Sequence, residues 1–223
     1  MSDLYDLQPL FPLPNVVLFP KAILPLHVFE ARYRTMMAEV LKGGQTICMA
    51  LLKPGWEGDY QGSPAVHEIA CVGRVVQHQH LPDDRYNIML HGEIKVAIES
   101  MERVEPFRVA RVRPVDEDLA WVDGPQVQDQ LTDLLTLFRR VNQGQGAAIE
   151  LAQVFGAHMS AEAILNTVAM NLNVEPIVKQ RLLDMERTEL RYRAVIEYLR
   201  DSVSTQDVID RVRHLYPDDR RQN

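Results

Sequence analysis

The chain has 223 residues, of which 46% are hydrophobic and 25% are charged, a composition typical of a globular protein with a substantial core. Its formal net charge of −7 opposes binding to nucleic acid or to an anionic membrane. No apolar run approaches the roughly 18 residues that cross a bilayer, and the N-terminus lacks the pattern of a secretory signal. Two cysteines, Cys48 and Cys71, form neither a CxxC pair nor a disulfide framework, so we expect a cytoplasmic protein.

The segment from Leu10 to Leu41 begins with short apolar runs and ends in a helical pattern. Prolines at positions 12, 14, 20 and 25 divide it, which predicts short strands over Val16–Phe19 and Ile23–Leu26. From Glu30 onward the apolar residues recur at the spacing of one helix face, so we predict a helix that ends before Gly43-Gly44.

The next part of the chain predicts a β-rich structure. Gly73 is expected to mark a bulge or bend, and the turn at Pro82–Arg85 is expected to join two strands as a hairpin. Several short strands with one early helix indicate a closed or nearly closed β-structure. The predicted strands are Thr46–Leu52, Ala65–Leu81, Tyr86–His91, Glu93–Ser100 and Phe107–Val115.

From Asp116 the apolar spacing is helical almost to the end of the chain. The predicted helices cover residues 127–141, Ala147–Phe155, a segment capped by Ser160 that extends to Leu172, Pro176 to about Arg200, and a last segment opened by Ser204 and Asp207. We therefore predict an α+β protein with two subdomains, a β-rich one over residues 1–116 and an α-helical bundle over residues 117–223.

Four segments resemble the N-terminal domain of Lon proteases. Leu10–Leu41 is similar to that family's opening, LPLFPLPxVVLFPGxxLPLHIFExRYR, and Leu81–Ile98 is similar to LPDGRYNIxLxGxxRFxI. Pro106–Val112 resembles PYRxAxV, and Lys179–Asp184 resembles KQxLLE. The resemblance runs from about residue 7 to residue 199, so it covers most of the chain.

The chain departs from these patterns at three places. Lys21 stands where the family commonly has Gly or Asn, Asp84 stands where it has Gly, and Lys95-Val96 replaces Arg-Phe. The first departure puts the local turn conformation in doubt, but it leaves the family resemblance intact.

The resemblance implies a PUA-like β-pseudobarrel with one early helix, followed by a helical bundle. In full-length Lon proteases this unit recognises substrate polypeptide and does no chemistry. The ATP-binding pattern GxxxxGK[ST] does not occur in the sequence. We therefore expect a stand-alone substrate-binding domain that lacks ATPase and peptidase activity and needs no cofactor.

The expected partner is unfolded or extended polypeptide, bound in an apolar groove or added to an open strand edge. Trp56, Tyr60 and Tyr86 are the predicted contact residues, because aromatic side chains in loops and turns supply contact area at small entropic cost. For Trp56 and Tyr60 the sequence favours folding back onto the barrel over exposure for contact, because large aromatic side chains are rarely left in water. His27 is interpreted as structural, hydrogen-bonded near the start of the helix.

Other chemical sites receive less support. Both cysteines lie in apolar strand contexts, which favours buried structural thiols. His78 and His80 share one face of a strand, with His67, Asp83 or Asp84 as further ligands, but a zinc site needs three or four committed ligands, so we expect no metal.

Two other functions remain as alternatives. One is a regulatory subunit of a separate protease or ATPase, contacted through the helical half. The other is RNA binding by a PUA-like barrel, for which Arg108, Arg111 and Arg113 would form a basic strip. The acidity of the whole chain weakens the second alternative.

Overall fold

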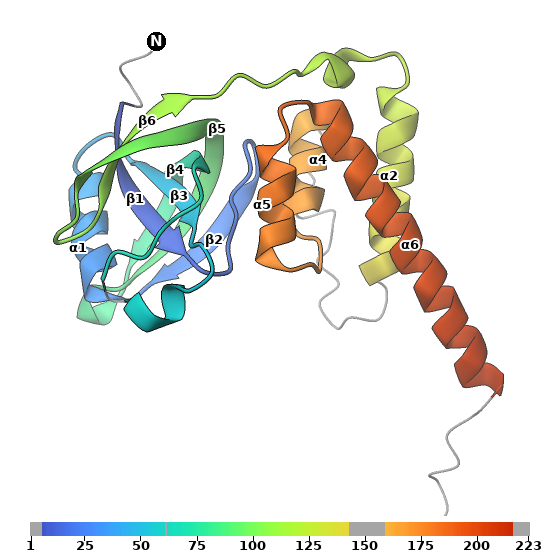
Figure 1. Ribbon diagram of the computed structural model, residues 1–223, viewed down its shortest axis with the longest axis horizontal. Coiled ribbons are helices and arrows are strands. Elements are labelled where there is room, and N and C mark those ends of the chain that lie inside the picture. The colour runs from blue at the N-terminus through green and yellow to red at the C-terminus, as the bar shows by residue number, and fades with distance from the viewer. Residues whose placement is uncertain (1–5, 61, 143–158, 216–223) are drawn as a thin grey trace, which may run out of the picture. The chain divides into compact units, whose positions relative to one another are not determined.

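The structure is a computed structural model that describes residues 6–60, 62–142 and 159–215, with side chains described as far as Thr205 (Figure 1). The chain forms two compact units, which are described separately. The first consists of Met1–Asp118 and Asn166–Arg187, and the second of Leu119–Leu165 and Thr188–Asn223. The subdomains predicted from the sequence, 1–116 and 117–223, stay a prediction.

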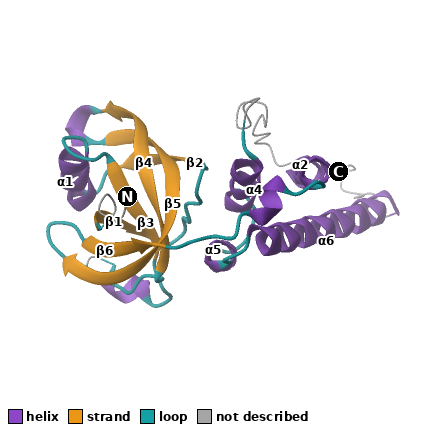
Figure 2. Cartoon of the chain, turned by 90° about the horizontal axis from the view of Figure 1, so that it is seen from above, coloured by secondary structure: helices purple, strands orange, loops and turns teal. Residues whose placement is uncertain are grey.

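Six strands form one sheet in the first unit (Figure 2). Their order is β2-β5-β4-β3-β1-β6, and β5 also pairs with β6, so the sheet closes on itself. The pairing of β1 with β3 is parallel, and the other pairings are antiparallel. The strands are β1 (Leu7–Leu13), β2 (Ile23–Val28), β3 (Thr46–Leu51), β4 (Ile69–His80), β5 (Tyr86–Arg103) and β6 (Val109–Pro114).

The interior of the sheet is filled mainly by small and β-branched side chains, together with Leu10 and Cys48. Helix α1 (Ala31–Val40) lies on the outside of the strands and buries Tyr33, Met36 and Met37 beneath it (Figure 2). The predicted early helix, the predicted hairpin and the expected bulge at Gly73 are confirmed.

Strand β1 contains Pro9 and Pro12, although prolines were expected to bound strands rather than interrupt them. The strand pairs with β6 over its first three residues and with β3 over its last four, so each half has a sheet neighbour on one side only. A proline is tolerated in this setting because its missing N–H need not remove a ladder bond.

The strand predicted over Val16–Phe19 is wrong. These residues form no ladder, but Val17, Leu18 and Phe19 are buried in the core. The segment crosses the face of Gly92 so closely that a Cβ atom there would lie 2.1 Å from the carbonyl oxygen of Phe19. The same contact explains why the two strands predicted over 86–100 are one continuous strand, since Gly92 lets β5 pass beneath this segment.

The helices that the structure describes after residue 120 are α2 (Val127–Asn142), α4 (Ala161–Met170), α5 (Pro176–Asp184) and α6 (Thr188–Leu215). Ser160 caps α4 as predicted, because its Oγ accepts the backbone N–H of Ala163 at 3.2 Å. The helix predicted over Ala147–Phe155 lies outside the described residues. The α+β class is confirmed, and no described helix has the length and apolarity needed to span a membrane.

The single helix predicted from Pro176 to Arg200 is wrong, because the structure has two helices there, α5 and α6, with a short non-helical connection between them. Helix α6 then continues without interruption past Ser204, where a separate last helix was predicted. The break has a tertiary cause. The Nζ atom of Lys95 donates to the carbonyl oxygens of Leu183 at 3.2 Å and Met185 at 2.8 Å. Carbonyl groups at the end of a helix need partners outside it, and here a strand residue supplies them.

Two of the departures from the family pattern fall at unusual backbone positions. Lys21 has φ of 63° and Asp84 has φ of 56°, which is the left-handed region that glycine adopts without steric cost. The family pattern has Gly or Asn at the position of Lys21 and Gly at the position of Asp84. The chain therefore keeps the left-handed backbone conformation at both turns, although a side chain at these positions makes that conformation less favourable than it is for glycine.

Candidate functional site

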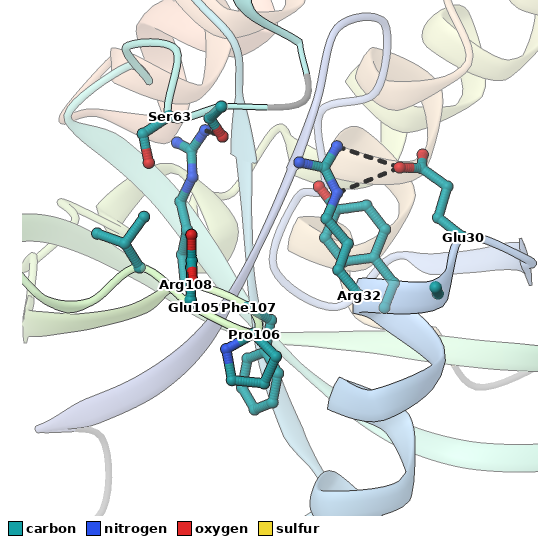
Figure 3. A pocket seen from close by; sticks show the side chains of 11 residues that line it. Glu30, Arg32, Ser63, Glu105, Pro106, Phe107 and Arg108 are labelled. Carbon is teal, nitrogen blue, oxygen red and sulfur yellow. Dashed lines mark hydrogen bonds and ion pairs between the residues drawn. The ribbon is translucent and has the colours of Figure 1, made fainter.

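A cavity of about 660 Å³ opens on the first unit between the start of α1 and the segment 104–108 (Figure 3). We call it the arginine pocket, because Arg32 and Arg108 line it. Phe107 and Val104 supply apolar surface, and Ser63 contributes a hydroxyl group from the loop between β3 and β4. In Figure 3 the side chains of Arg32 and Arg108 extend in the same direction from the two walls.

Glu30, Arg32 and Tyr60 form a hydrogen-bonded cluster at one wall of the pocket. The Tyr60 hydroxyl donates to Glu30 Oε1 at 2.6 Å, and Arg32 Nε donates to Glu30 Oε2 at 3.2 Å. A second nitrogen of Arg32 donates to the Tyr60 carbonyl oxygen at 3.2 Å. The cluster fixes the loop that carries Tyr60 against the first turn of α1, and both oxygens of the Glu30 carboxylate are engaged within it.

Arg32 also lies over two aromatic rings, with its guanidinium carbon 4.6 Å from the Tyr33 centroid and 5.0 Å from that of Tyr60. Burial raises the pKa of Tyr33 to about 12, and burial together with the Glu30 hydrogen bond raises the pKa of Tyr60. Both phenols are therefore neutral near pH 7, and the charges of this wall are those of Glu30 and Arg32.

Arg108 forms the other wall, just before β6. It is 6% exposed, and it donates to the carbonyl oxygens of Pro64 at 2.8 Å and Gly62 at 3.4 Å. No carboxylate of the described residues forms an ion pair with it, and burial lowers the pKa of its guanidinium. A buried cation whose partners are only neutral carbonyl groups is uncommon, because desolvation of the charge is costly.

A smaller cavity of about 280 Å³ adjoins the arginine pocket and shares Glu30 and Tyr33 with it. We call it the aromatic groove. Its lining is mostly apolar and includes Phe11, Leu26, Phe29 and Tyr60. Phe29 is 61% exposed and stacks on His27 with 6.0 Å between ring centroids, so a large apolar ring faces solvent beside the groove.

Strand β2 leads into the aromatic groove and has a sheet neighbour, β5, on one side only within the described sheet. Gly92 donates its N–H to the carbonyl oxygen of Ala22, so the register places the polar groups of Leu24 and Leu26 toward β5 and those of Ile23, Pro25 and His27 outward. Pro25 thus occupies an outward position, where its missing N–H costs no ladder bond.

The structure brings two of the three predicted contact residues together. Trp56 and Tyr60 meet edge to face with 5.6 Å between ring centroids, both partly exposed, at the 3-10 turn Trp56–Asp59. Tyr86 lies elsewhere, at the start of β5, where it is 8% exposed and stacks on His80. The peptide-binding role of all three residues stays a prediction, and burial makes Tyr86 the least accessible of them.

Sequence reasoning missed Phe29, and it identified Arg108 only as part of a basic strip for RNA. Phe29 lies at the end of a proline-rich apolar run, where it looks like a core residue. Arg108 lies among alternating arginines, but Arg111 pairs with Asp6 and Glu102, and Arg113 pairs with Glu99. The proposed basic strip is therefore divided between exposed, paired arginines and one buried arginine.

Both cysteines are buried, as predicted. Burial raises the pKa of Cys48 to about 12 and that of Cys71 well above its ordinary value, so neither thiol is poised as a nucleophile. His27 forms a hydrogen bond with Asn87, 2.7 Å between Nδ1 and Oδ1. His80 pairs with Asp84, and among the described residues no three His, Cys, Asp or Glu side chains gather as a metal site would require.

The fold is that of Lon N-terminal domains. A crystal structure of a Lon N-terminal domain protein from Xanthomonas campestris matches 86% of this chain and 98% of its own with a TM-score of 0.58 at 20% identity. The N-terminal domain of a Mycobacterium avium complex Lon protease matches 87% of this chain and 98% of its own with a TM-score of 0.64 at 14% identity.

A family model described as the ATP-dependent protease La (LON) substrate-binding domain matches residues 8–201. The chain therefore belongs to this family. Lon protease 2 of Syntrophobacter fumaroxidans is 25% identical over 204 residues, which cover 91% of this chain and 25% of the relative. The Lon protease of Anaeromyxobacter dehalogenans is 27% identical over 202 residues, 89% of this chain and 23% of the relative. The chain thus spans about a quarter of the length of these curated relatives.

Proposed function

We propose that the chain is a non-catalytic module that binds unfolded or extended polypeptide and acts as an adaptor or chaperone-like factor in cytoplasmic protein quality control. Membership of the substrate-binding family supports polypeptide as the ligand. The observation that carries the proposal is the open edge of β2, which leads into the aromatic groove. A strand edge beside apolar pockets suits an extended chain, since its backbone pairs with the edge while alternate side chains enter the pockets.

Exposed apolar side chains at both ends of β2 support this surface. Ile23 is 41% exposed at the start of the strand, and Phe29 is 61% exposed just beyond its end. Tyr60 lines the groove and contacts Trp56, and the loop that carries both is held by the bonds from Arg32 and Tyr60. A side chain such as Phe29 supplies binding energy when a partner covers it, because its apolar area then leaves water.

Binding of casein, a permanently unfolded protein, tests the proposal by fluorescence anisotropy with a folded protein of similar size as the negative control. We expect casein to bind with micromolar affinity, and Phe29→Ala to weaken binding about tenfold because it removes an exposed aromatic contact. Leu190→Ala is the matched control, since Leu190 is another exposed apolar side chain, on α6 of the second unit. Absence of casein binding at high micromolar concentration contradicts the proposal.

The edge itself is tested with peptides that carry N-methyl groups on alternate backbone nitrogens. Added strands pair through every second residue, so methylation in one phase removes the bonds to β2 and methylation in the other phase leaves them intact. We expect one phase to abolish binding and the other to preserve it. Equal affinity of the two phases would show that the groove binds side chains without strand addition.

A further inference from the structure

Arg108 differs from Arg32, the other arginine that lines the two cavities, because none of the described residues forms an ion pair with it. Its two bonds to Pro64 and Gly62 use two of the five N–H donors of a guanidinium group. Arg32, across the arginine pocket, is neutralised by Glu30 at 3.1 Å. The pocket therefore contains one buried positive charge with which no carboxylate of the described residues forms an ion pair, and Asp59 acts on it only from a longer distance.

The surroundings of Arg108 suit a small anion attached to an apolar group. Phe107 is buried beside it, Val104 is exposed on the rim, and Ser63 offers a hydroxyl group from the adjacent loop (Figure 3). A guanidinium group binds a carboxylate through two parallel N–H bonds, and the bond is strong where water is largely excluded.

We propose that the arginine pocket binds the C-terminal carboxylate of the polypeptide ligand, with Arg108 as the residue that recognises it, an inference that rests on the proposed function. The pocket then binds the C-terminal carboxylate of the ligand, and the aromatic groove binds the ligand residues that precede it. The polypeptide class is unchanged, but ligands with a free and accessible C-terminus are preferred.

The arrangement of the two cavities sets the direction of the bound chain. Strand β2 runs toward residues 26–30, which line the aromatic groove, and residues 30–33 line the arginine pocket beyond it. A peptide whose carboxylate lies at Arg108 therefore places its upstream residues beside the groove and the β2 edge. Such a peptide runs parallel to β2.

The charges near the pocket favour a singly charged carboxylate over a polyanion. Of the two arginines that line the pocket, Arg32 is paired with Glu30, and Arg108 has no ion pair among the described residues. Glu105 is exposed on the rim and would repel a ligand with more than one negative charge. A nucleic acid would bring several phosphates toward a chain of net charge −7. One carboxylate therefore matches the one buried arginine of the pocket that has no ion pair among the described residues.

Two fluorescent peptides of identical apolar sequence test the inference on the full chain, one with a free C-terminal acid and one with a C-terminal carboxamide. We expect the acid to bind about tenfold more tightly or better, as a charge-assisted pair requires. Equal affinities overturn the inference while they leave the proposed function standing. If neither the peptides nor casein bind, the proposed function fails instead.

Variants separate recognition from a structural role of Arg108. Arg108→Gln is expected to reduce the ratio of acid to carboxamide affinity to about one, while the carboxamide affinity stays within about twofold. A structural role would weaken both peptides equally and leave the ratio unchanged, which would count against the inference. Arg113→Gln is the control, because it removes the same charge from an exposed arginine paired with Glu99, and it should leave the ratio intact.

N-Acetyl-leucine distinguishes a chain end from a free small carboxylate, and it requires no variant. We expect N-acetyl-leucine to displace the acid peptide only weakly, with an affinity about a hundredfold lower than that of the peptide. It lacks the residues that would occupy the groove and the β2 edge. Competition as strong as that of the peptide itself would make the pocket a small-molecule site and overturn the inference.

Discussion

Two regions of the first unit each bury a basic side chain, and the two side chains have different partners. Where α5 meets the strands, Lys95 is 1% exposed and pairs with Glu117 at 3.1 Å in addition to its two carbonyl acceptors. In the arginine pocket, Arg108 is 6% exposed and bonds only to carbonyl groups. We call these the α5-contacting side and the pocket side.

The difference separates a residue that holds the fold from one suited to a ligand. A buried charge with its counter-charge and full hydrogen bonding is costly to disturb, since removal of one partner leaves the other buried. A buried charge without a counter-charge gains stability when a ligand supplies one. Burial alone therefore does not distinguish the two roles, whereas the nature of the partners does.

The largest expected effect is on the α5-contacting side. Lys95→Met should lower the free energy of unfolding by about 3–5 kcal/mol, because Glu117 stays buried without this ammonium group and the end of α5 loses a donor. Urea unfolding followed by circular dichroism measures the change. The double variant Lys95→Met with Glu117→Leu should recover part of the lost stability. If Lys95→Met alone is within about 1 kcal/mol of the wild type, Lys95 does not hold the fold and the proposed difference from Arg108 is contradicted.

The next effect tests the close approach of the segment at Phe19 to β5, the strand that carries Lys95. Gly92→Ala should destabilise the protein by about 3 kcal/mol, because the new Cβ atom would lie 2.1 Å from the backbone oxygen of Phe19, and backbone moves less easily than a side chain. Thermal unfolding measures the change. Gly58→Ala is the control, since nothing lies within 4 Å of a Cβ atom at that position. Similar melting temperatures for the two variants would contradict the prediction.

Sequence patterns predicted most of the strands and the helical character of the second half, because alternation and helical spacing are local properties. They missed β1, whose two prolines were expected to bound strands. The hairpin turn at 82–85 and the bulge at Gly73 follow from residue chemistry at single positions. The end of α5 could not be predicted, because apolar residues continue in phase across Met185 and the break depends on a lysine that is 90 positions away in the sequence.

The candidate site was only partly predictable for a similar reason. Trp56 and Tyr60 could be identified as neighbours in one loop. The position of Arg108 in a cavity depends on where the loop at 62–64 and the first turn of α1 come to rest, and its alternation with Arg111 and Arg113 is typical of an ordinary solvated strand. The absence of an acidic partner is a property of three-dimensional packing, which no spacing in the sequence reports.

A smaller effect is expected on the pocket side. Arg108→Met should destabilise the protein by about 1 kcal/mol, because the loss of two carbonyl bonds is partly offset by relief of the desolvated charge. Urea unfolding under the conditions used for Lys95→Met makes the two variants comparable. A loss as large as that of Lys95→Met would show that Arg108 holds the fold in the same way, and the distinction between the two sides would disappear.

The smallest effect concerns strain in the turn that precedes β2. Lys21 has φ of 63°, a conformation that costs a lysine about 1–2 kcal/mol and costs a glycine little, whereas a glycine increases the entropy of the unfolded chain. Lys21→Gly should therefore stabilise the protein by about 0.5 kcal/mol, measured as a higher urea midpoint. Lys42→Gly is the control, because Lys42 is exposed in a turn without a positive φ, so the same change there should destabilise. If both variants destabilise equally, the turn is unstrained, and the substitution of lysine for the family's Gly or Asn carries no conformational cost.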